Sequence, residues 1–164
     1  MNQYGHILEI GCGTGGNLKM LSRFGNVTAM ERDDYAREHI PSDVEAEILK
    51  GWLPDGLSSI NNKKFDLICL FDVLEHIKED VQSLVILKDY LKPGAKLLLT
   101  APAYPWMFST HDANLGHYRR YTRRELLLKC KNTGYKIRYA GYMNMFLLPF
   151  MILIRFIDKI IYCS

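Results

Sequence analysis

Residues 7–16 read Ile7-Leu-Glu-Ile-Gly-Cys-Gly-Thr-Gly-Gly16, an apolar strand pattern that runs directly into a glycine-rich turn. The segment from Asn17 to Phe24 follows with the amphipathic pattern of a helix. Glycine lets the backbone turn tightly and approach a ligand closely, because it has no Cβ. The free N–H groups at the start of the helix would point toward that ligand. The stretch therefore predicts a strand, a turn and a helix that together hold a nucleotide-like ligand.

The size and composition of the chain are those of one globular domain. It has 164 residues, of which 48% are hydrophobic and 24% charged. The formal net charge of +3 gives no bulk attraction to nucleic acid, so no nucleic-acid partner is expected. The cysteines at positions 12, 69, 130 and 163 show no metal-ligand spacing, and we interpret them as reduced thiols in a cytoplasmic protein.

Apolar runs of strand length alternate with helical patterns along the chain, which is typical of a parallel sheet built from βαβ units. We therefore expect an α/β fold with a doubly wound, mostly parallel sheet in three layers. Ligands of such sheets bind at the carboxyl ends of the strands. The expected strands are residues 6–10, 27–31, 46–50, 65–71, 96–101 and 136–140.

Two longer helices are predicted between these strands. The first would cover residues 78–91 and end at Lys92-Pro-Gly94, where proline and glycine stop a helix. The second would begin at Thr122-Arg-Arg-Glu125, which has the form of a capping box, and end near Gly134. The apolar face of the first would carry Val81, Leu84, Val85 and Leu91.

The end of the chain is apolar, with ten apolar residues in a row from Met145 to Ile154. Spanning a bilayer needs about twenty, and Pro149 and Arg155 interrupt the longer window, so no transmembrane helix is expected. We divide the chain into a core of residues 1–141 and an apolar segment of residues 142–164. This segment would pack on the core, on a partner or on a membrane surface. The abrupt start at a strand and the apolar end suggest a fragment truncated at both ends.

An acidic residue next to the glycine loop helps to decide which of two classes of cofactor the loop would bind. Gly11, Gly13 and Gly16 satisfy the pattern G-x-G-x-x-G of dinucleotide sites, and Glu31 follows Gly11 by 20 residues. However, Glu9 lies at the strand end just before the first glycine. Its carboxylate would face a pyrophosphate of like sign in a dinucleotide, whereas it would attract the cationic groups of S-adenosylmethionine. The charge therefore favours S-adenosylmethionine, and an NAD(P)-dependent oxidoreductase is the weaker alternative.

Several stretches resemble motifs of class I S-adenosylmethionine-dependent methyltransferases, in the same order and at similar intervals. The resemblance implies a Rossmann-like methyltransferase fold over about residues 6 to 140. The stretches that resemble the general family are residues 7–15, Phe65-Asp-Leu-Ile-Cys-Leu-Phe-Asp-Val-Leu-Glu-His-Ile77 and Leu91-Lys-Pro-Gly-Ala-Lys-Leu-Leu-Leu99. Those that resemble a bacterial and archaeal subgroup, of type 11 or 23, are Pro102-Ala-Tyr-Pro-Trp106 and Gly116-His-Tyr-Arg-Arg-Tyr-Thr122.

The resemblance also implies how S-adenosylmethionine would be held. Glu31, at the end of the second strand, would accept hydrogen bonds from both ribose hydroxyls. The family often has an acidic residue after the third strand, but this chain has Trp52 and Leu53 there, whose backbone would contact the adenine. Trp52 is equally a candidate for the core. The expected cofactor-binding residues are Glu9, Gly11, Gly13, Gly15, Glu31, Trp52, Leu53, Phe71 and Asp72.

Methyl transfer needs a base only when the acceptor must lose a proton, because the methyl group is already activated and positioning supplies much of the rate. His76 is the predicted general base, since it follows the fourth strand and titrates near neutrality. The alternative is a histidine that caps or packs at the next helix. Asp72, Glu75 and His76 would converge on a divalent ion only if a helical turn continued through Ile77, and we expect no metal.

The segment of residues 108–121 is polar, aromatic and long enough to fold over the active site. Four arginines between positions 119 and 124 flank the expected helix start, where positive charge opposes the helix dipole. Either an anionic group on the acceptor or salt bridges to Asp112 or Glu125 would explain them. The predicted partner is a small or lipid-linked acceptor. The alternative is a non-catalytic or truncated cofactor-binding module, which would bind the cofactor weakly or not at all. The predicted substrate residues are His111, His117, Tyr118, Arg119 and Tyr121.

Overall fold

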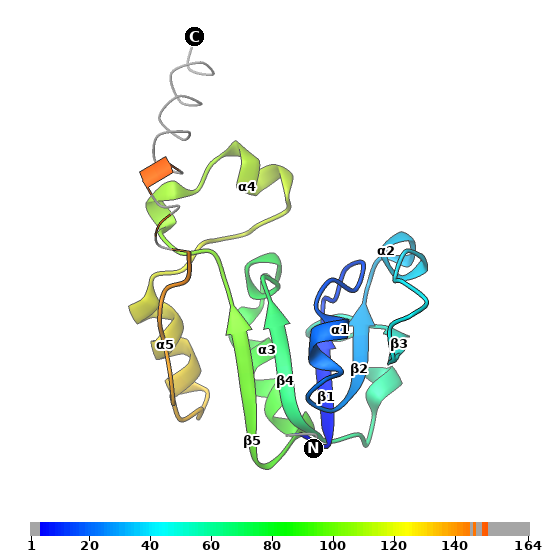
Figure 1. The fold of residues 1–164 in the computed structure, drawn as a ribbon. Helices are drawn as coiled ribbons and strands as arrows, with labels where there is room; N and C mark the ends of the chain where they lie inside the picture. The colour runs from blue at the N-terminus through cyan, green and yellow to red at the C-terminus, as the bar shows by residue number, and fades with distance from the viewer. Residues whose placement is uncertain (1–3, 145, 147–148, 151–164) are drawn as a thin grey trace. The chain divides into compact units, whose positions relative to one another are not determined.

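The computed structural model describes residues 4–144, 146 and 149–150. The chain divides into two compact units, Met1–Ala101 and Pro102–Ser164, and each is described by itself. Among the described residues, the first unit contains the sheet, and the second contains helices joined by loops (Figure 1). The predicted boundary between residues 141 and 142 falls inside the second unit.

The sheet of the first unit has five strands and is parallel throughout (Figure 1). Its order is β3-β2-β1-β4-β5, so the chain starts at the centre, winds to one edge and then returns to build the other. The carboxyl ends of β1 and β4 therefore meet at the point where the winding reverses, which is where such sheets bind ligands. The predicted fold class is confirmed. The strands are β1 (His6–Ile10), β2 (Asn26–Glu31), β3 (Ala46–Lys50), β4 (Phe65–Phe71) and β5 (Leu91–Thr100).

Both faces of the central strands are buried. Ile7 and Leu8 point to opposite faces because they are neighbours in β1, and neither is exposed to solvent. This explains why the central strands have almost continuous apolar runs. On one face the short helix α1 (Leu18–Leu21) packs on the sheet. The buried cluster there consists of Ile7, Cys12, Leu18, Leu21, Val27, Ala29, Leu67 and Cys69.

The other helices of the first unit are short. The predicted helix over residues 78–91 forms as an α-helix over residues 80–87 and a 3₁₀ turn over residues 88–90. Its predicted apolar face is wrong, because Leu84 and Leu87 are buried together with Asp80 and Ser83, whereas Val81 and Val85 are exposed. The buried residues have the i, i+3, i+4, i+7 spacing of one helix face. The elements are α2 (Asp34–Glu38), α3 (Asp80–Leu87) and the 3₁₀ turns η1 (Ser58–Ile60), η2 (Leu74–His76) and η3 (Lys88–Tyr90).

The predicted sixth strand at residues 136–140 is wrong, because these residues have no regular structure. The alternation of Ile137 and Tyr139 with polar residues has the period of a strand, but the side chain of Tyr139 is 88% exposed. Alternation indicates a strand only where a neighbouring strand supplies hydrogen bonds. The last strand of the sheet is β5, which begins at Leu91, earlier than predicted, and includes an irregular register opposite Phe65 and Leu67.

The second unit contains η4 (Pro105–Met107), α4 (Thr110–Asn114) and α5 (Arg123–Asn132). The predicted cap of α5 is confirmed: Thr122 Oγ1 accepts a hydrogen bond of 3.1 Å from the backbone N–H of Glu125. Most of the predicted apolar segment at residues 142–164 lies outside the described residues. A helix with the length and apolar character of a bilayer span is absent from the part of the chain that the structure describes.

Candidate active site

The glycine loop lies against the ends of β2 and β4. Gly11 has a φ of +76°, and a Cβ at this position would lie 2.5 Å from a methyl carbon of Val73, so only glycine fits. Gly13 has a φ of +54°, and a Cβ there would meet no atom within 4 Å. Gly15 lies against core side chains. Gly13 is therefore the predicted cofactor-binding glycine that borders open space in the first unit.

Glu9 is a fully buried carboxylate at the carboxyl end of β1. Its Oε1 accepts a 3.0 Å hydrogen bond from Nδ2 of Asn17, whereas its Oε2 has no partner among the described residues. Burial raises the pKa of the Glu9 carboxyl, and the Asn17 hydrogen bond opposes this only in part. Asn17 stands at the N-cap of α1, yet its side chain does not cap the helix. A buried oxygen without a donor favours a ligand that supplies a donor or a positive charge.

Glu31 ties the glycine loop to the end of β2. Its Oε2 accepts a hydrogen bond of 2.9 Å from the N–H of Gly13, and its Oε1 accepts one of 2.9 Å from the N–H of Asp33. Arg37 donates to the backbone oxygen of Glu31 at 3.1 Å. These contacts fix the orientation of the carboxylate, and each oxygen keeps acceptor capacity for a further donor.

Trp52 and Leu53, which follow β3, differ in burial. Leu53 is buried, whereas Trp52 is 41% exposed, so the alternative in which Trp52 belongs to the core is wrong. The guanidinium of Arg32 lies 5.8 Å from the centre of the Trp52 ring, within the range of a cation–π contact. Gly56 lies so close under the ring that a Cβ there would be 2.4 Å from it. The indole is thus held at the surface, at the carboxyl edge of the sheet.

Asp72 connects the carboxyl ends of β4 and β5. Its N–H donates to Oγ1 of Thr100 at 3.1 Å, and the Thr100 hydroxyl donates to Oδ1 of Asp72 at 3.0 Å. Phe71, just before it, is half-buried. His76 is exposed at the end of η2, and Ile77 is extended. The helical turn therefore does not continue through Ile77. The convergence of Asp72, Glu75 and His76 on a divalent ion required that turn.

Two buried cysteines border the same edge. Burial, and then the nearby carboxylates of Glu9 and Glu31, raise the pKa of Cys12 to about 12. Burial and Glu9 raise the pKa of Cys69 to about 12. Both side chains are protonated thiols at neutral pH, which excludes a thiolate nucleophile at these positions.

Comparison with known proteins decides the family. A family model described as a methyltransferase domain matches residues 2–140. The chain belongs to this family. The resemblance to class I S-adenosylmethionine-dependent methyltransferases is thereby confirmed, whereas no curated protein matches the chain.

The methyltransferase domain is similar in fold to many solved structures. An S-adenosylmethionine-dependent methyltransferase from Mesorhizobium loti has 14% identity and a TM-score of 0.72, with 97% of this chain and 89% of that chain covered. The plantazolicin methyltransferase BpumL, solved with a desmethylplantazolicin analogue and S-adenosylhomocysteine, has 18% identity and a TM-score of 0.63. That match covers 77% of this chain, which spans only 54% of BpumL. At these identities the similarity shows the fold.

A third similar structure is a Haloferax volcanii putative methyltransferase in complex with the Trm112 methyltransferase activator. Its match has 14% identity and a TM-score of 0.65, and it covers 82% of this chain and 62% of that chain. The chain thus spans less than two thirds of the length of two of these three structures.

The second unit of the methyltransferase domain is organised around Asp112, whose side chain is fully buried. Asp112 accepts hydrogen bonds from Nε of Arg120 at 2.7 Å, from the N–H of Ser109 at 3.0 Å and from Nδ1 of His117 at 3.1 Å. Burial by itself raises the pKa of Asp112, but the hydrogen bonds of Arg120, Ser109 and His117 outweigh it and lower the pKa to about 2. A salt bridge to Asp112 therefore explains Arg120, as one alternative predicted.

Glu125 is the other predicted partner of the arginines. Its Oε1 lies 3.7 Å from Nζ of Lys129. Arg119 lies over the ring of Tyr118 at 5.9 Å, and Arg123 donates to the backbone oxygen of Ala140 at 3.1 Å. Arg119, Arg120 and Arg123 thus have different surroundings, and one explanation does not serve for all three.

The predicted substrate residues are all in the second unit, in different environments. His111 and Tyr118 are exposed, Arg119 is half-buried, and His117 is held by Asp112. Tyr121 is buried, and its backbone forms a bridge with Ala103. Sequence reasoning missed Asn17 and Thr100, which hold Glu9 and Asp72. Asn17 has the position of an ordinary helix cap, and Thr100 ends an apolar strand, so neither pattern indicates a contact to a site.

Proposed function

We propose that the chain transfers a methyl group from S-adenosylmethionine to a small or lipid-linked acceptor. The observation that carries the proposal is the buried Glu9 carboxylate, with one oxygen lacking a partner among the described residues, beside the open surface at Gly13. An oxygen of this kind fits a cofactor that carries ammonium and sulfonium groups. The family match and the S-adenosylhomocysteine complex of BpumL support the same cofactor.

The residues have separable roles in this proposal. S-adenosylmethionine, when bound, supplies an activated methyl group for in-line displacement. Glu9 would face its cationic part, and Glu31 would accept hydrogen bonds from the ribose. Trp52 would border the adenine. His76, exposed after β4, would take a proton from an acceptor that has to lose one.

The acceptor and the location of the protein are proposed from other features of the chain. The polar and aromatic segment of residues 108–121 supports an acceptor with an anionic or hydrogen-bonding group. The membrane contact of residues 142–164 and the cytoplasmic location stay predictions. An NAD(P)-dependent oxidoreductase is disfavoured, since it would place a pyrophosphate near the buried carboxylate of Glu9.

Thermal unfolding with and without ligand tests the proposal. A hundredfold excess of S-adenosylhomocysteine over its Kd should raise the Tm by about 5–10 °C. NAD at the same concentration should leave the Tm unchanged. A shift with NAD alone would support the oxidoreductase, and no shift with either ligand would support a non-catalytic module.

Glu31→Ala is expected to weaken S-adenosylhomocysteine binding by about 1–3 kcal/mol, because hydrogen bonds to a charged carboxylate are lost. Isothermal titration calorimetry measures this change. Glu38→Ala is the matched control, since Glu38 is exposed on α2, and it should keep the wild-type Kd. The ribose role of Glu31 is contradicted if both variants bind as the wild type does.

A further inference from the structure

The two units differ in charge, although the whole chain is almost neutral. Residues 1–101 contain 11 lysines and arginines and 15 acidic residues, a formal charge of −4. Residues 102–164 contain 10 lysines and arginines and only 3 acidic residues, a formal charge of +7. An asymmetry of this kind indicates a contact with an anionic macromolecule or surface.

Few acidic groups of the second unit are available to neutralise its basic side chains. Asp112 is buried against Arg120, and Glu125 lies near Lys129. The third acidic residue, Asp158, lies outside the described residues. In the described part of this unit, the exposed basic residues are Arg123, Arg124, Lys131, Lys136 and Arg138.

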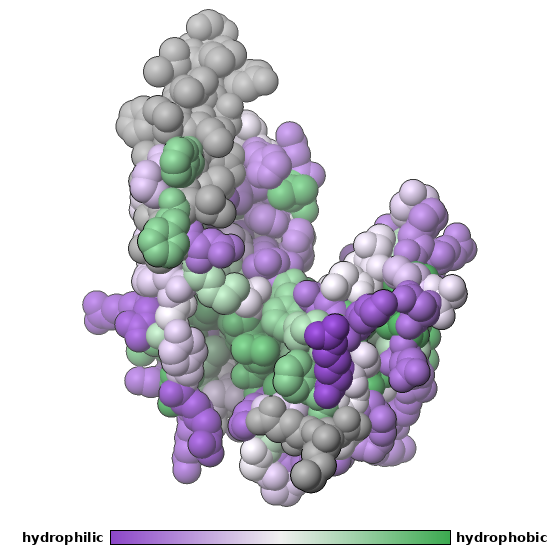
Figure 2. Space-filling model, viewed as in Figure 1, coloured by the Kyte–Doolittle hydropathy of each residue, from purple (hydrophilic) through white to green (hydrophobic). Residues whose placement is uncertain are grey.

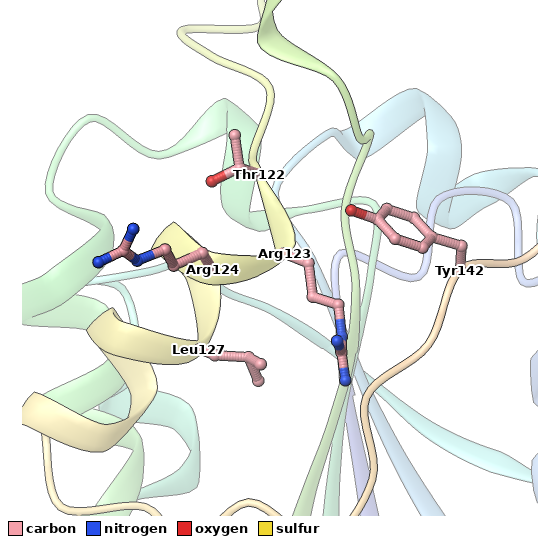
Figure 3. Close-up of a pocket in the computed structure, with 5 residues that line it drawn as sticks. All are labelled: Thr122, Arg123, Arg124, Leu127 and Tyr142. Carbon is pink, nitrogen blue, oxygen red and sulfur yellow. The ribbon is translucent and has the colours of Figure 1, made fainter.

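A pocket of about 480 Å³ lies at the start of α5, within the second unit, lined by Thr122, Arg123, Arg124, Leu127 and Tyr142. Figure 3 shows the two arginine side chains pointing to opposite sides of the first turn of the helix. This arrangement of the two arginines therefore does not suit a single small anion held between both guanidinium groups. The arrangement suits a surface with many negative charges.

Aromatic rings continue from this pocket. The Tyr142 ring stacks on Tyr104 with a centroid distance of 5.4 Å, and Tyr104 lies 5.9 Å from Trp106. Trp106 is 65% exposed. We call Tyr104, Trp106, Arg123, Arg124 and Tyr142 the aromatic–basic patch. Tryptophan and tyrosine beside arginine are typical of the interface between lipid headgroups and acyl chains.

Exposed apolar side chains on the same unit favour a lipid surface over nucleic acid as the ligand of the aromatic–basic patch. Phe108, Leu115 and Met143 are exposed as well, and hydrophobic side chains reach the visible surface beside hydrophilic ones in Figure 2. The sequence then continues with the apolar run of residues 145–154. Nucleic acid binds arginines and stacks on aromatic rings but offers little to aliphatic side chains. Anionic lipid engages all three kinds of side chain.

We propose that the second unit docks on an anionic lipid surface through the aromatic–basic patch. The arginines would contact lipid phosphates, and Trp106 would enter the headgroup region. The proposal does not rest on methyl transfer, because its support lies in charge and exposure alone.

Vesicle sedimentation with the full chain tests the proposal. At low salt the protein should bind vesicles of phosphatidylcholine with a third of phosphatidylglycerol, and it should bind pure phosphatidylcholine much more weakly. The double charge reversal Arg123→Glu with Arg124→Glu should lower the partition coefficient at least about tenfold. The matched control, Arg23→Glu with Lys88→Glu, makes the same charge change at exposed positions of the first unit and should stay within about twofold of the wild type.

Fluorescence gives a second measurement that needs no charge variant. The chain has two tryptophans, so Trp106 is the only tryptophan in a Trp52→Phe background and can be excited selectively. Its emission should shift to the blue with anionic vesicles and not with glycerol phosphate at the same phosphate concentration. The proposal is overturned if the wild type does not bind anionic vesicles, if both double variants bind equally, or if a single-stranded oligonucleotide binds more tightly than the vesicles do.

Discussion

Asp112→Asn is expected to lower the free energy of unfolding of the second unit by about 3 kcal/mol. Asp112 is fully buried, and the side chain of Arg120 that it contacts is 10% exposed. The amide removes the negative charge while the guanidinium stays buried, and an uncompensated buried charge is costly. His117 and the N–H of Ser109 would lose their charged acceptor as well.

Urea unfolding, followed by Trp106 fluorescence in a Trp52→Phe background, measures this loss. Glu125→Gln is the control, because the surface pair of Glu125 with Lys129 contributes at most a few tenths of a kcal/mol. The pKa of Asp112 is lowered to about 2 in the folded state, so its stabilisation is complete above the ordinary carboxyl pKa of about 4. The difference between the wild type and Asp112→Asn should therefore shrink as the pH falls from about 4 to about 2. Equal stability of the two proteins at pH 7 would contradict the central role of Asp112.

Gly11→Ala is expected to lower the free energy of unfolding of the first unit by about 2–4 kcal/mol. A left-handed conformation costs a residue with a Cβ roughly 1–2 kcal/mol, and the φ of Gly11 is +76°. The new methyl group would also lie 2.5 Å from a methyl carbon of Val73, and such overpacking costs about 1–3 kcal/mol. Chemical denaturation followed by circular dichroism measures the change.

Gly16→Ala is the control in the same loop. A Cβ at Gly16 would meet no atom within 4 Å, and its φ is not positive. The free energy of unfolding of Gly16→Ala should stay within about 0.5 kcal/mol of that of the wild type. If the two alanine variants were equally stable, the contact between Gly11 and Val73 would not hold the loop against β4.

The central strands β1, β2 and β4 could be predicted because burial on both faces gives continuous apolar runs. The bounds of β1, β3 and β4 agree with the prediction, and β2 starts one residue earlier. The buried face of α3 could not be found from hydrophobicity, since Asp80 and Ser83 bond to the backbone of their own turn. Asp80 Oδ1 accepts from the N–H of Val81 at 2.7 Å, and Ser83 Oγ donates to the oxygen of Glu79 at 3.1 Å.

Site residues could be predicted where a sequence motif specifies both the residue type and the strand at whose end it lies. Glu9, Gly13 and Glu31 lie at the carboxyl ends of β1 and β2, and the Gly13–Glu31 hydrogen bond joins two of them. The Asn17 contact to Glu9 depends on the path of the loop, which no sequence pattern specifies. The charge of the second unit was hidden in the total of +3, because the opposite charge of the first unit cancels most of it.

The buried Glu9 carboxylate is expected to recognise a cationic cofactor. Calorimetric titration of S-adenosylmethionine into the wild type and into Glu9→Gln tests this expectation most directly. The Kd should rise at least about tenfold in the variant, while its Tm stays equal or rises, because a neutral amide replaces a carboxylate whose buried Oε2 lacks a partner among the described residues. Glu45→Gln, at an exposed position before β3, should bind as the wild type does. The same Kd for the wild type and Glu9→Gln would contradict this expectation.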